Sequence, residues 1–361
     1  MDAKDYLLEY KKKVDPFLKD YFQNKLKTAK NIDPLAEQAV RLISNFTLAS
    51  GKRIRPAMLY YAFLANKKEI SDEEEKSLIR ASMSIELTHT FLLIHDDIID
   101  RDEKRHGINT VHKEYREIAR KIFPKTNEEH FGNSMAMITG DIAATMANEI
   151  LFESDFPEKN ILKGLTQLQR IVYKTIPGEM LDIVMEARGS TSEEEILRMH
   201  EGKTANYTFE GPLHLGATLA GENSNDFFHF LSNYSSAVGK AFQIRDDILG
   251  VFGNEKKLGK PVGSDIIEGK QTLLYIKAKE KATKEQKKHL QQIFNKKELS
   301  KRELKIFQDI VKETGSLQYS ENLAADFAEK AIQSLEKIDF KNNKSYDFLR
   351  KIAEYIAKRD H

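Results

Sequence analysis

The sequence predicts an all-α protein. Helical patterns of apolar residues follow one another along most of the chain, and no strand-like alternation of polar and apolar residues is sustained. Only 8 prolines and 18 glycines interrupt the 361 residues. Because no internal repeat or low-complexity linker divides the chain, we expect a single domain over residues 1–361.

The helices can be placed in order from their start and stop signals. Asp33 can cap the second helix, Pro56 suits the first turn of the third, and Ser71 with Glu74 forms a capping box for the fourth. After Gly107 comes a short amphipathic piece that Pro124 closes, and then a segment rich in Ala, Met and Gly that predicts close helix packing. The other helices are predicted at residues 3–28, 35–48, 158–175, 179–188, 193–220, 224–250, 316–337 and 344–358, with very polar surface helices and loops over 279–305.

The composition excludes several classes of protein. The 57 basic and 56 acidic residues nearly cancel, so a nucleic acid is not expected as a partner. The chain has no cysteine, which excludes disulfides and agrees with a reducing cytoplasm. Its first residues lack the apolar region of a signal peptide, and its apolar runs fall short of the ~20 residues of a membrane span. We therefore expect a soluble cytoplasmic protein.

An acidic cluster follows the apolar run that starts at Glu86. Asp96 and Asp100 are four residues apart and share one helix face, with Asp97 about a quarter-turn away. Nothing in the run itself neutralises them, and oxygen ligands of this kind suit Mg²⁺. A solvated helix end is the alternative, but the apolar run predicts a buried helix with its carboxylates at the mouth of a cavity. Glu86 and His89 also form half of a di-iron motif, but no second copy is present.

A second acidic pair, Asp246 and Asp247, closes another apolar helix in the same way. Two such helices facing one another would hold several divalent ions and leave positions open for a diphosphate. Two unrelated solvated helix ends are the alternative.

Basic residues occur where a phosphate would need them. Lys52, Arg53 and Arg55 lie at a helix start, although a basic terminus packed on surface acids would look the same. Lys203 and Thr204 lie at a helix start or kink, and Lys260 and Lys270 lie on a Gly-rich stretch soon after the second acidic pair. None of these belongs to a Walker A loop.

Taken together, the motifs resemble those of trans-isoprenyl diphosphate synthases, the polyprenyl synthetase family. The match is strongest over residues 51–274 and comprises, in family order, GKRIRP, DDIID, HFGNSMAMITGD, GEMLDI, GKT, QIRDDILG and GKPVGSDIIEGK. The resemblance implies an isoprenoid synthase-type helical bundle around a deep central cavity, which the helices at 316–358 complete, and usually a homodimer.

The resemblance also implies roles for single residues. Asp96, Asp100 and Asp246 would bind three Mg²⁺ ions together with diphosphate, supported by Asp97 and Asp247. The allylic diphosphate would be held by Arg105, Lys203, Gln243, Lys260 and Lys270, with Thr204 near the reacting carbon. Lys203, Thr204 and Gln243 would stabilise the allylic cation by their oxygen dipoles. Isopentenyl diphosphate would be held by Lys52, Arg55 and His89.

Two positions depart from the family pattern. His106 stands where a second arginine usually binds isopentenyl diphosphate, and a neutral imidazole holds a diphosphate less firmly. Gly250 stands where many members have a third aspartate.

Product length is predicted from the residues just before the first acidic cluster. Phe91 lies roughly 7.5 Å along the helix from Asp96 and would act as a floor for the growing chain, unless it is an ordinary core aromatic. Because Leu92 is not aromatic, a geranylgeranyl product is favoured over a farnesyl product.

Three other functions are alternatives to a short-chain prenyltransferase. A class I terpene cyclase would need neither GKRIRP nor the second aspartate pair. A non-catalytic regulatory subunit of a prenyl synthase tends to lose an aspartate motif, and both are present. A helical interaction scaffold leaves the buried acids unexplained.

Overall fold

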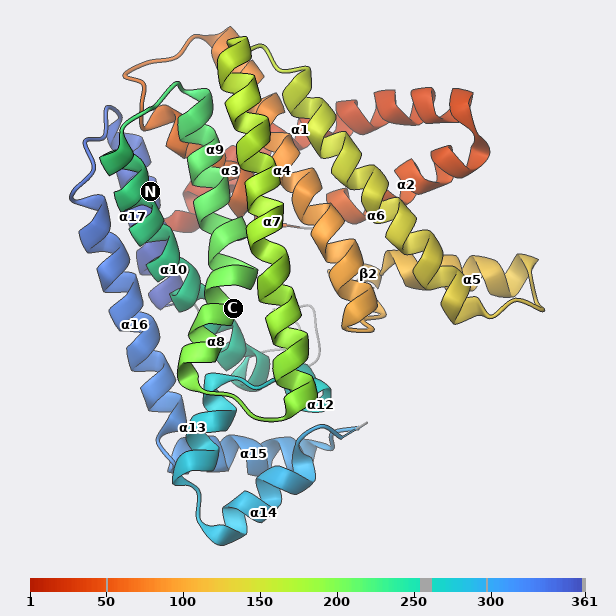
Figure 1. Ribbon diagram of the computed structural model, residues 1–361, viewed down its shortest axis with the longest axis vertical. Helices are drawn as coiled ribbons and strands as arrows, with labels where there is room; N and C mark the ends of the chain where they lie inside the picture. Colours follow the sequence, from red (N-terminus) through yellow and green to blue (C-terminus); the bar gives the residue numbers. More distant parts are fainter. Residues whose placement is uncertain (50, 254–261, 297, 359–361) are drawn as a thin grey trace. The chain divides into compact units, whose positions relative to one another are not determined.

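A computed structural model describes residues 1–49, 51–253, 262–296 and 298–358. Helices dominate these residues, so the predicted all-α fold is confirmed (Figure 1). The strands within them are β1 (Lys104–Arg105) and β2 (Ile108–Asn109), which form one antiparallel pair. The chain divides into two compact units, and none of the described helices is long and apolar enough to cross a membrane.

The first unit comprises Met1–Leu168, Pro212–Glu222 and Lys341–Ser345. Its helices are α1 (Ala3–Ile32), α2 (Pro34–Ala49), α3 (Ile54–Leu64), α4 (Asp72–Ile99), α5 (Val111–Ile122), α6 (Glu128–Phe152), the start of α7 (Glu158–Arg188) and most of α9 (Gly211–Leu219).

Helix α4 packs against α1, α2, α3, α5 and α6 in the first unit. The Ser71 side chain accepts a hydrogen bond from the Glu74 amide, which confirms the predicted start of this helix. Its central turns are buried and pack along α6, which presents the buried small residues Ala136, Gly140 and Ala143 to them. The predicted close packing of the Ala- and Gly-rich segment is thereby confirmed.

The second unit comprises Gln169–Gly211, Asn223–Phe340 and Tyr346–His361. It contains the rest of α7, the π-helix η1 (Glu201–Glu210), and α8 (Glu193–His200), α10 (Asn225–Phe252), α12 (Ser264–Glu268), α13 (Leu273–Lys281), α14 (Lys284–Ile293), α15 (Lys301–Glu313), α16 (Ser316–Leu335) and most of α17 (Asn343–Ala357).

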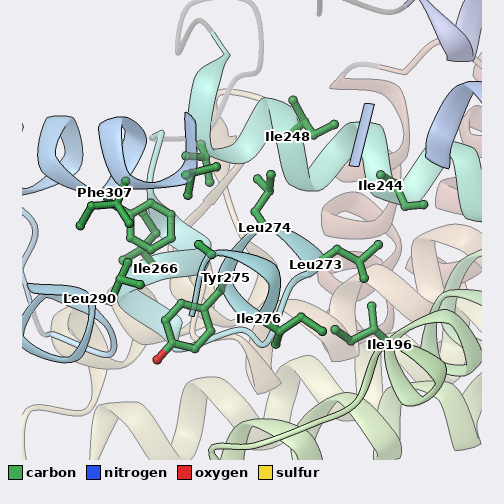
Figure 2. Close-up of a cluster of buried hydrophobic side chains, with 14 of the residues drawn as sticks. Ile196, Ile244, Ile248, Ile266, Leu273, Leu274, Tyr275, Ile276, Leu290 and Phe307 are labelled. Carbon is green, nitrogen blue, oxygen red and sulfur yellow. The ribbon is translucent and has the colours of Figure 1, made fainter. Parts of the chain in front are cut away.

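Helices α10 and α16 lie side by side in the second unit, with buried alanines of α16 along their contact (Figure 1). One end of α10 is fixed by an apolar cluster that α12, α13, α14 and α15 complete (Figure 2). In this cluster the ring of Tyr275 stacks on that of Phe294, with 3.7 Å between centroids. The mostly polar segment around residues 279–305 was predicted to lie at the surface. It also contributes apolar side chains to the core.

Two helix boundaries differ from the sequence-based prediction. The predicted break near residues 175–179 is absent, because α7 continues through Pro177. The predicted helix over 193–220 is instead α8, η1 and α9 in succession. Both differences lie beside Lys203, a predicted site residue.

Candidate active site

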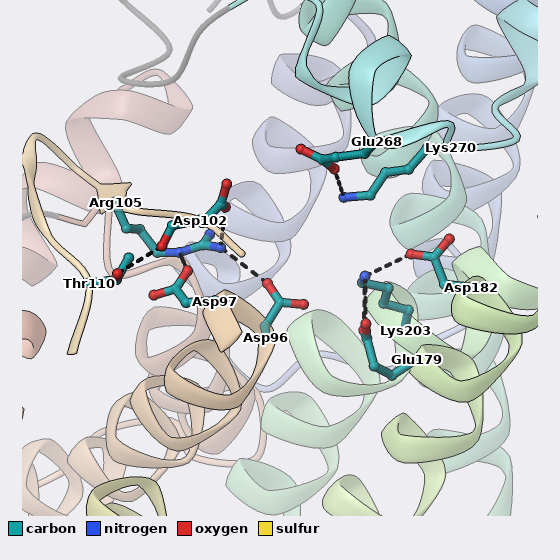
Figure 3. Close-up of polar contacts among 10 residues, drawn as sticks. All are labelled: Asp96, Asp97, Asp102, Arg105, Thr110, Glu179, Asp182, Lys203, Glu268 and Lys270. Carbon is teal, nitrogen blue, oxygen red and sulfur yellow. Dashed lines mark hydrogen bonds and ion pairs between the residues drawn. The ribbon is translucent and has the colours of Figure 1, made fainter. Parts of the chain in front are cut away.

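In the first unit, the acidic end of α4 is bridged by Arg105 from β1. Its Nη2 lies 3.2 Å from Asp96 Oδ2 and 3.2 Å from Asp102 Oδ2, and its Nε donates to Asp97 (Figure 3). Asp100 forms the C-cap of the helix, and its amide donates to the Asp96 carbonyl oxygen at 2.8 Å. The neutralising cation that the run itself lacks therefore comes from a strand that follows it.

The two adjacent aspartates of this cluster have different surroundings. Asp97 is fully buried, and burial raises its pKa to about 7 although Arg105 opposes the rise. Asp96 is half-buried. Asp97 thus anchors Arg105 inside the protein, whereas Asp96 lies nearer to solvent, where a cation can reach it.

Arg105 is held in place by a hairpin turn. His106 and Gly107 have φ values of 53° and 82°, as a type I′ turn between β1 and β2 requires. Histidine enters the left-handed region more readily than most residues, so this turn accommodates His106. The side chain of His106 is exposed at the turn, yet partial burial and then Arg105 lower its pKa.

The predicted residues for isopentenyl diphosphate are partly brought together. Arg55 on α3 lies 3.1 Å from the Nε2 atom of His89 on α4. Burial, followed by the charges of Arg55 and Arg105, lowers the pKa of His89 well below its ordinary value. His89 is therefore neutral near pH 7, and its contact with Arg55 requires Nε2 to be the acceptor.

Arg53, from the same motif as Arg55, points elsewhere. Its backbone is left-handed, with φ 53°, and its buried guanidinium bonds Asp15 Oδ1 at 2.9 Å, the Thr47 carbonyl oxygen at 2.9 Å and Glu86. Glu86 is thereby explained as the partner of Arg53 and not as a metal ligand. Arg53 therefore packs on acids, as in the alternative prediction for this basic stretch, but its partner Glu86 is buried and not a surface acid.

In the second unit, η1 packs closely against α7 and α10, and each of these contacts includes a glycine. A Cβ atom on Gly178 of α7 would lie 2.8 Å from the Cα atom of Gly202, and one on Gly239 of α10 would come closer than 3.0 Å to Ala205. Only hydrogen fits at such distances, so the backbone of η1 touches both neighbours. Irregular helices of this kind are frequent at functional sites.

Within η1, Lys203 contacts side chains of α7 and Thr204 contacts a side chain of α10. Lys203 Nζ lies 2.9 Å from Glu179 and 2.8 Å from Asp182, both on α7 (Figure 3). Thr204 Oγ1 donates to Gln243 Oε1 at 2.7 Å, and Gln243 Nε2 donates to Asp247 Oδ1 at 3.0 Å. Three predicted residues, Thr204, Gln243 and Asp247, thus form one hydrogen-bonded chain.

The second aspartate pair repeats the asymmetry of the first. Asp247 is 7% exposed, and its Oδ2 lies 3.5 Å from Nε2 of the fully buried His200, whereas Asp246 is half-buried. A Cβ atom on Gly250 would lie 2.5 Å from the Asp265 carboxylate, so a side chain at this position would collide with it.

Four further predicted residues are two lysines after the second aspartate pair and two residues before the first. Lys270 Nζ lies 2.7 Å from Glu268 (Figure 3). Lys260 lies outside the described residues. Phe91 and Leu92 on α4 are both half-buried.

The structure adds Glu179 and Asp182 as partners of Lys203. Their spacing of three residues within GEMLDI was the signal that could have paired them on one helix face.

Among the described residues, no three acidic or histidine side chains form a ready-made metal site. The donor set at each helix end still fits Mg²⁺, which prefers one or two carboxylates plus oxygens of a bound phosphate. The half-buried Asp96 and Asp246 are suited to supply these carboxylates.

The sequence matches the family model described as "Polyprenyl synthetase" over residues 37–311. The chain belongs to the polyprenyl synthetase family. A geranylgeranyl diphosphate synthase from Sulfolobus acidocaldarius is 32% identical over 98% of both chains. A geranylgeranyl pyrophosphate synthase from Geoglobus acetivorans is 34% identical over 90% of this chain and 92% of its own.

A solved structure supports the same assignment for the fold. The geranylgeranyl pyrophosphate synthase of Corynebacterium glutamicum, complexed with isoprenyl diphosphate and magnesium, aligns with a TM-score of 0.89. It is 30% identical and covers 99% of this polyprenyl synthetase and 100% of its own chain. The predicted family, the isoprenoid synthase-type fold and the enzyme class, a short-chain trans-prenyltransferase, are thereby confirmed.

Proposed function

We propose that this polyprenyl synthetase condenses isopentenyl diphosphate head to tail with an allylic diphosphate and releases geranylgeranyl diphosphate. The observation that carries the proposal is the asymmetry of the two aspartate pairs. Arg105 holds the buried Asp97, and Gln243 holds the buried Asp247, while Asp96 and Asp246 remain half-buried. At each helix end, one carboxylate is buried against a protein partner and the other is half-buried, where a cation can reach it.

In this proposal, Asp96, Asp100 and Asp246 bind three Mg²⁺ ions, which neutralise the diphosphate leaving group. Lys203 and Lys270 bind the allylic diphosphate, with Arg105, Gln243 and Lys260. The carbon–oxygen bond of the allylic substrate breaks, and the double bond of isopentenyl diphosphate attacks the resulting cation. The released diphosphate accepts the proton that the new chain loses, so no protein base is required.

Thr204 and Gln243 support the cation by oxygen dipoles. The hydrogen bond between them leaves lone pairs of Thr204 Oγ1 available, because the hydroxyl donates its proton to Gln243. Preoriented dipoles of this kind stabilise charge that develops in a transition state.

The isopentenyl diphosphate site is assigned to Lys52, Arg55, His89 and His106. The contact of Arg55 with neutral His89 supports this assignment, since it brings two of these side chains together. We also propose that the two units form one prenyl synthase domain that works as a homodimer in the cytoplasm.

Chromatography of the products tests the proposal. The purified protein, incubated with Mg²⁺, isopentenyl diphosphate and either dimethylallyl, geranyl or farnesyl diphosphate, should yield a twenty-carbon product. Failure to elongate any primer would contradict the enzyme function and favour a non-catalytic subunit. A fifteen-carbon main product would identify a farnesyl diphosphate synthase instead.

Substitutions test the assigned aspartates. Asp96→Ala and Asp246→Ala should each lower kcat by at least about a hundredfold, because each removes a ligand that stabilises transition-state charge. The exposed Asp326 on α16 provides a matched control, and Asp326→Ala should leave kcat unchanged.

A further inference from the structure

His95 links the metal-binding end of α4 to the proposed floor residue Phe91. The two rings meet edge to face, with centroids 5.0 Å apart and an angle of 75°. The Nδ1 atom of His95 lies 3.1 Å from the carbonyl oxygen of Phe91, one helical turn earlier. The imidazole therefore lies against both the ring and the backbone of Phe91.

The imidazole of His95 occupies a space that Gly140 leaves open on α6. A Cβ atom on Gly140 would lie 2.7 Å from His95 Nδ1 and closer still to Cε1. Gly140 is within α6 and does not have a positive φ, so its backbone does not require glycine. A glycine inside a helix costs roughly 0.5–1 kcal/mol relative to alanine. The space that His95 occupies accounts for the absence of a side chain at this position.

The other edge of His95 faces the residue after Gly140. Its Nε2 atom lies 3.7 Å from Asp141 Oδ1, and the Asp141 side chain is 72% exposed. Gly140 thus leaves room for one edge of the imidazole, and the Asp141 carboxylate lies near the other edge.

We propose that Gly140 and His95 are positioning residues that determine product length by fixing the ring of Phe91. This inference rests on the proposed function and on the sequence-based prediction that Phe91 closes the space for the growing prenyl chain. A side chain at position 140 displaces the imidazole, the ring of Phe91 loses its edge contact and turns aside, and longer chains fit.

The test is the product distribution of Gly140→Ala in the full chain. With farnesyl and isopentenyl diphosphates, the ratio of products longer than twenty carbons to the twenty-carbon product should rise at least tenfold. An unchanged ratio in this folded variant overturns the inference.

Gly132 offers a matched control on the same helix. A Cβ atom there would lie 2.5 Å from Arg116 Cγ and 2.6 Å from the His112 carbonyl oxygen, so Gly132→Ala creates similar crowding at another place. It should lower the melting temperature but leave the product ratio at its original value. If Gly132→Ala shifts the ratio as much as Gly140→Ala does, the effect is general loosening and the inference is wrong.

Double substitutions show whether Gly140 acts through Phe91. The variant Phe91→Ala/Gly140→Ala should give the same products as Phe91→Ala alone, because the ring that Gly140 positions is already gone. Additive lengthening would mean that Gly140 acts independently, against the inference. If Phe91→Ala leaves the product length unchanged, the prediction that Phe91 is the floor is wrong. If Phe91→Ala lengthens the products but Gly140→Ala does not, Phe91 is the floor and only the inference about Gly140 is wrong.

His95→Ala keeps the inference testable if Gly140→Ala does not fold. It removes the ring that supports Phe91 without crowding, so it should lengthen the products as well. It also makes room at position 140, so His95→Ala/Gly140→Ala should be more stable than Gly140→Ala. An unchanged product ratio in His95→Ala contradicts the inference whatever its effect on rate.

Discussion

The backbone of Gly178 on α7 lies directly against that of Lys203 on η1. A Cβ atom on Gly178 would come closer than 3.0 Å to the Lys203 amide nitrogen, and neither backbone can retreat as a flexible side chain can. The contact fixes the position of the Lys203 backbone against α7, and so the position from which its side chain reaches Glu179 and Asp182.

Gly178→Ala should therefore displace η1 and lower kcat as well as stability. Overpacking of this kind typically costs about 1–3 kcal/mol. Thermal unfolding and kcat for prenyl transfer measure the two effects.

Gly164→Ala, on the same helix, is the control for Gly178→Ala. Its Cβ would lie 3.2 Å from Leu215 Cδ1 and 3.2 Å from Leu219 Cδ2, and these side chains can shift. Normal activity in Gly178→Ala would mean that η1 tolerates displacement and that the contact does not position Lys203.

The ion pair of Arg53 with Glu86 predicts a large effect on stability. Both side chains are buried, so Arg53→Ala leaves the Glu86 carboxylate without its partner, at a cost of roughly 3–5 kcal/mol. Urea unfolding measures the loss. Arg41→Ala removes an exposed pair with Glu37 and should cost less than about 1 kcal/mol.

Replacing both partners separates the charge effect from packing. Arg53→Met/Glu86→Leu should recover part of the stability that Arg53→Ala loses, because no unpaired buried charge remains. If Arg53→Ala is as mild as Arg41→Ala, the buried pair does not hold α3 and α4 in place.

The contrast between Arg53 and Arg55 shows what the sequence could and could not reveal. The basic motif, the capping Ser71 and the acidic end of α4 were predictable because they depend on local spacing. Which arginine points to His89 and which to Glu86 depends on the left-handed backbone at Arg53, and nothing in the local sequence specifies that conformation.

The π-helix was beyond prediction for a related reason. The sequence predicts a helix start or kink at residues 203–204 but no π-helix, and Pro177–Gly178 carries an ordinary break signal. The structure has a π-helix at the first and a continuous helix at the second, and the two touch one another. Contacts between segments about 25 residues apart override local preference here, beside predicted site residues.

Binding of isopentenyl diphosphate should depend on pH through His89 and His106. Their environment lowers both pKa values below 6.5, so both imidazoles are neutral above pH 7 in the free enzyme. An approaching diphosphate favours the protonated form and raises these pKa values, so binding takes up protons. KM for isopentenyl diphosphate should therefore rise between pH 6 and pH 8, by at most about tenfold per pH unit for each proton taken up.

His106→Arg tests which group is responsible for this dependence. A permanently charged guanidinium should lower KM for isopentenyl diphosphate at pH 8 and reduce the slope of KM against pH. Ionisation of the substrate itself affects both proteins equally, so the difference in slope reports His106. Identical slopes would exclude His106 from the site.

Addition and removal of Mg²⁺ should affect stability only when a diphosphate is present. Arg105 already binds Asp96, Asp97 and Asp102, so Mg²⁺ alone would have to compete with it for Asp96. A diphosphate offers Arg105 another anionic partner and supplies the missing oxygen ligands. Mg²⁺ with inorganic pyrophosphate at a hundred times its Kd should stabilise the protein by about 2.7 kcal/mol. In thermal unfolding, EDTA and Asp96→Ala should each abolish this shift. A full shift with Mg²⁺ alone would mean that the carboxylates form a metal site without the substrate and that Arg105 does not control access to Asp96.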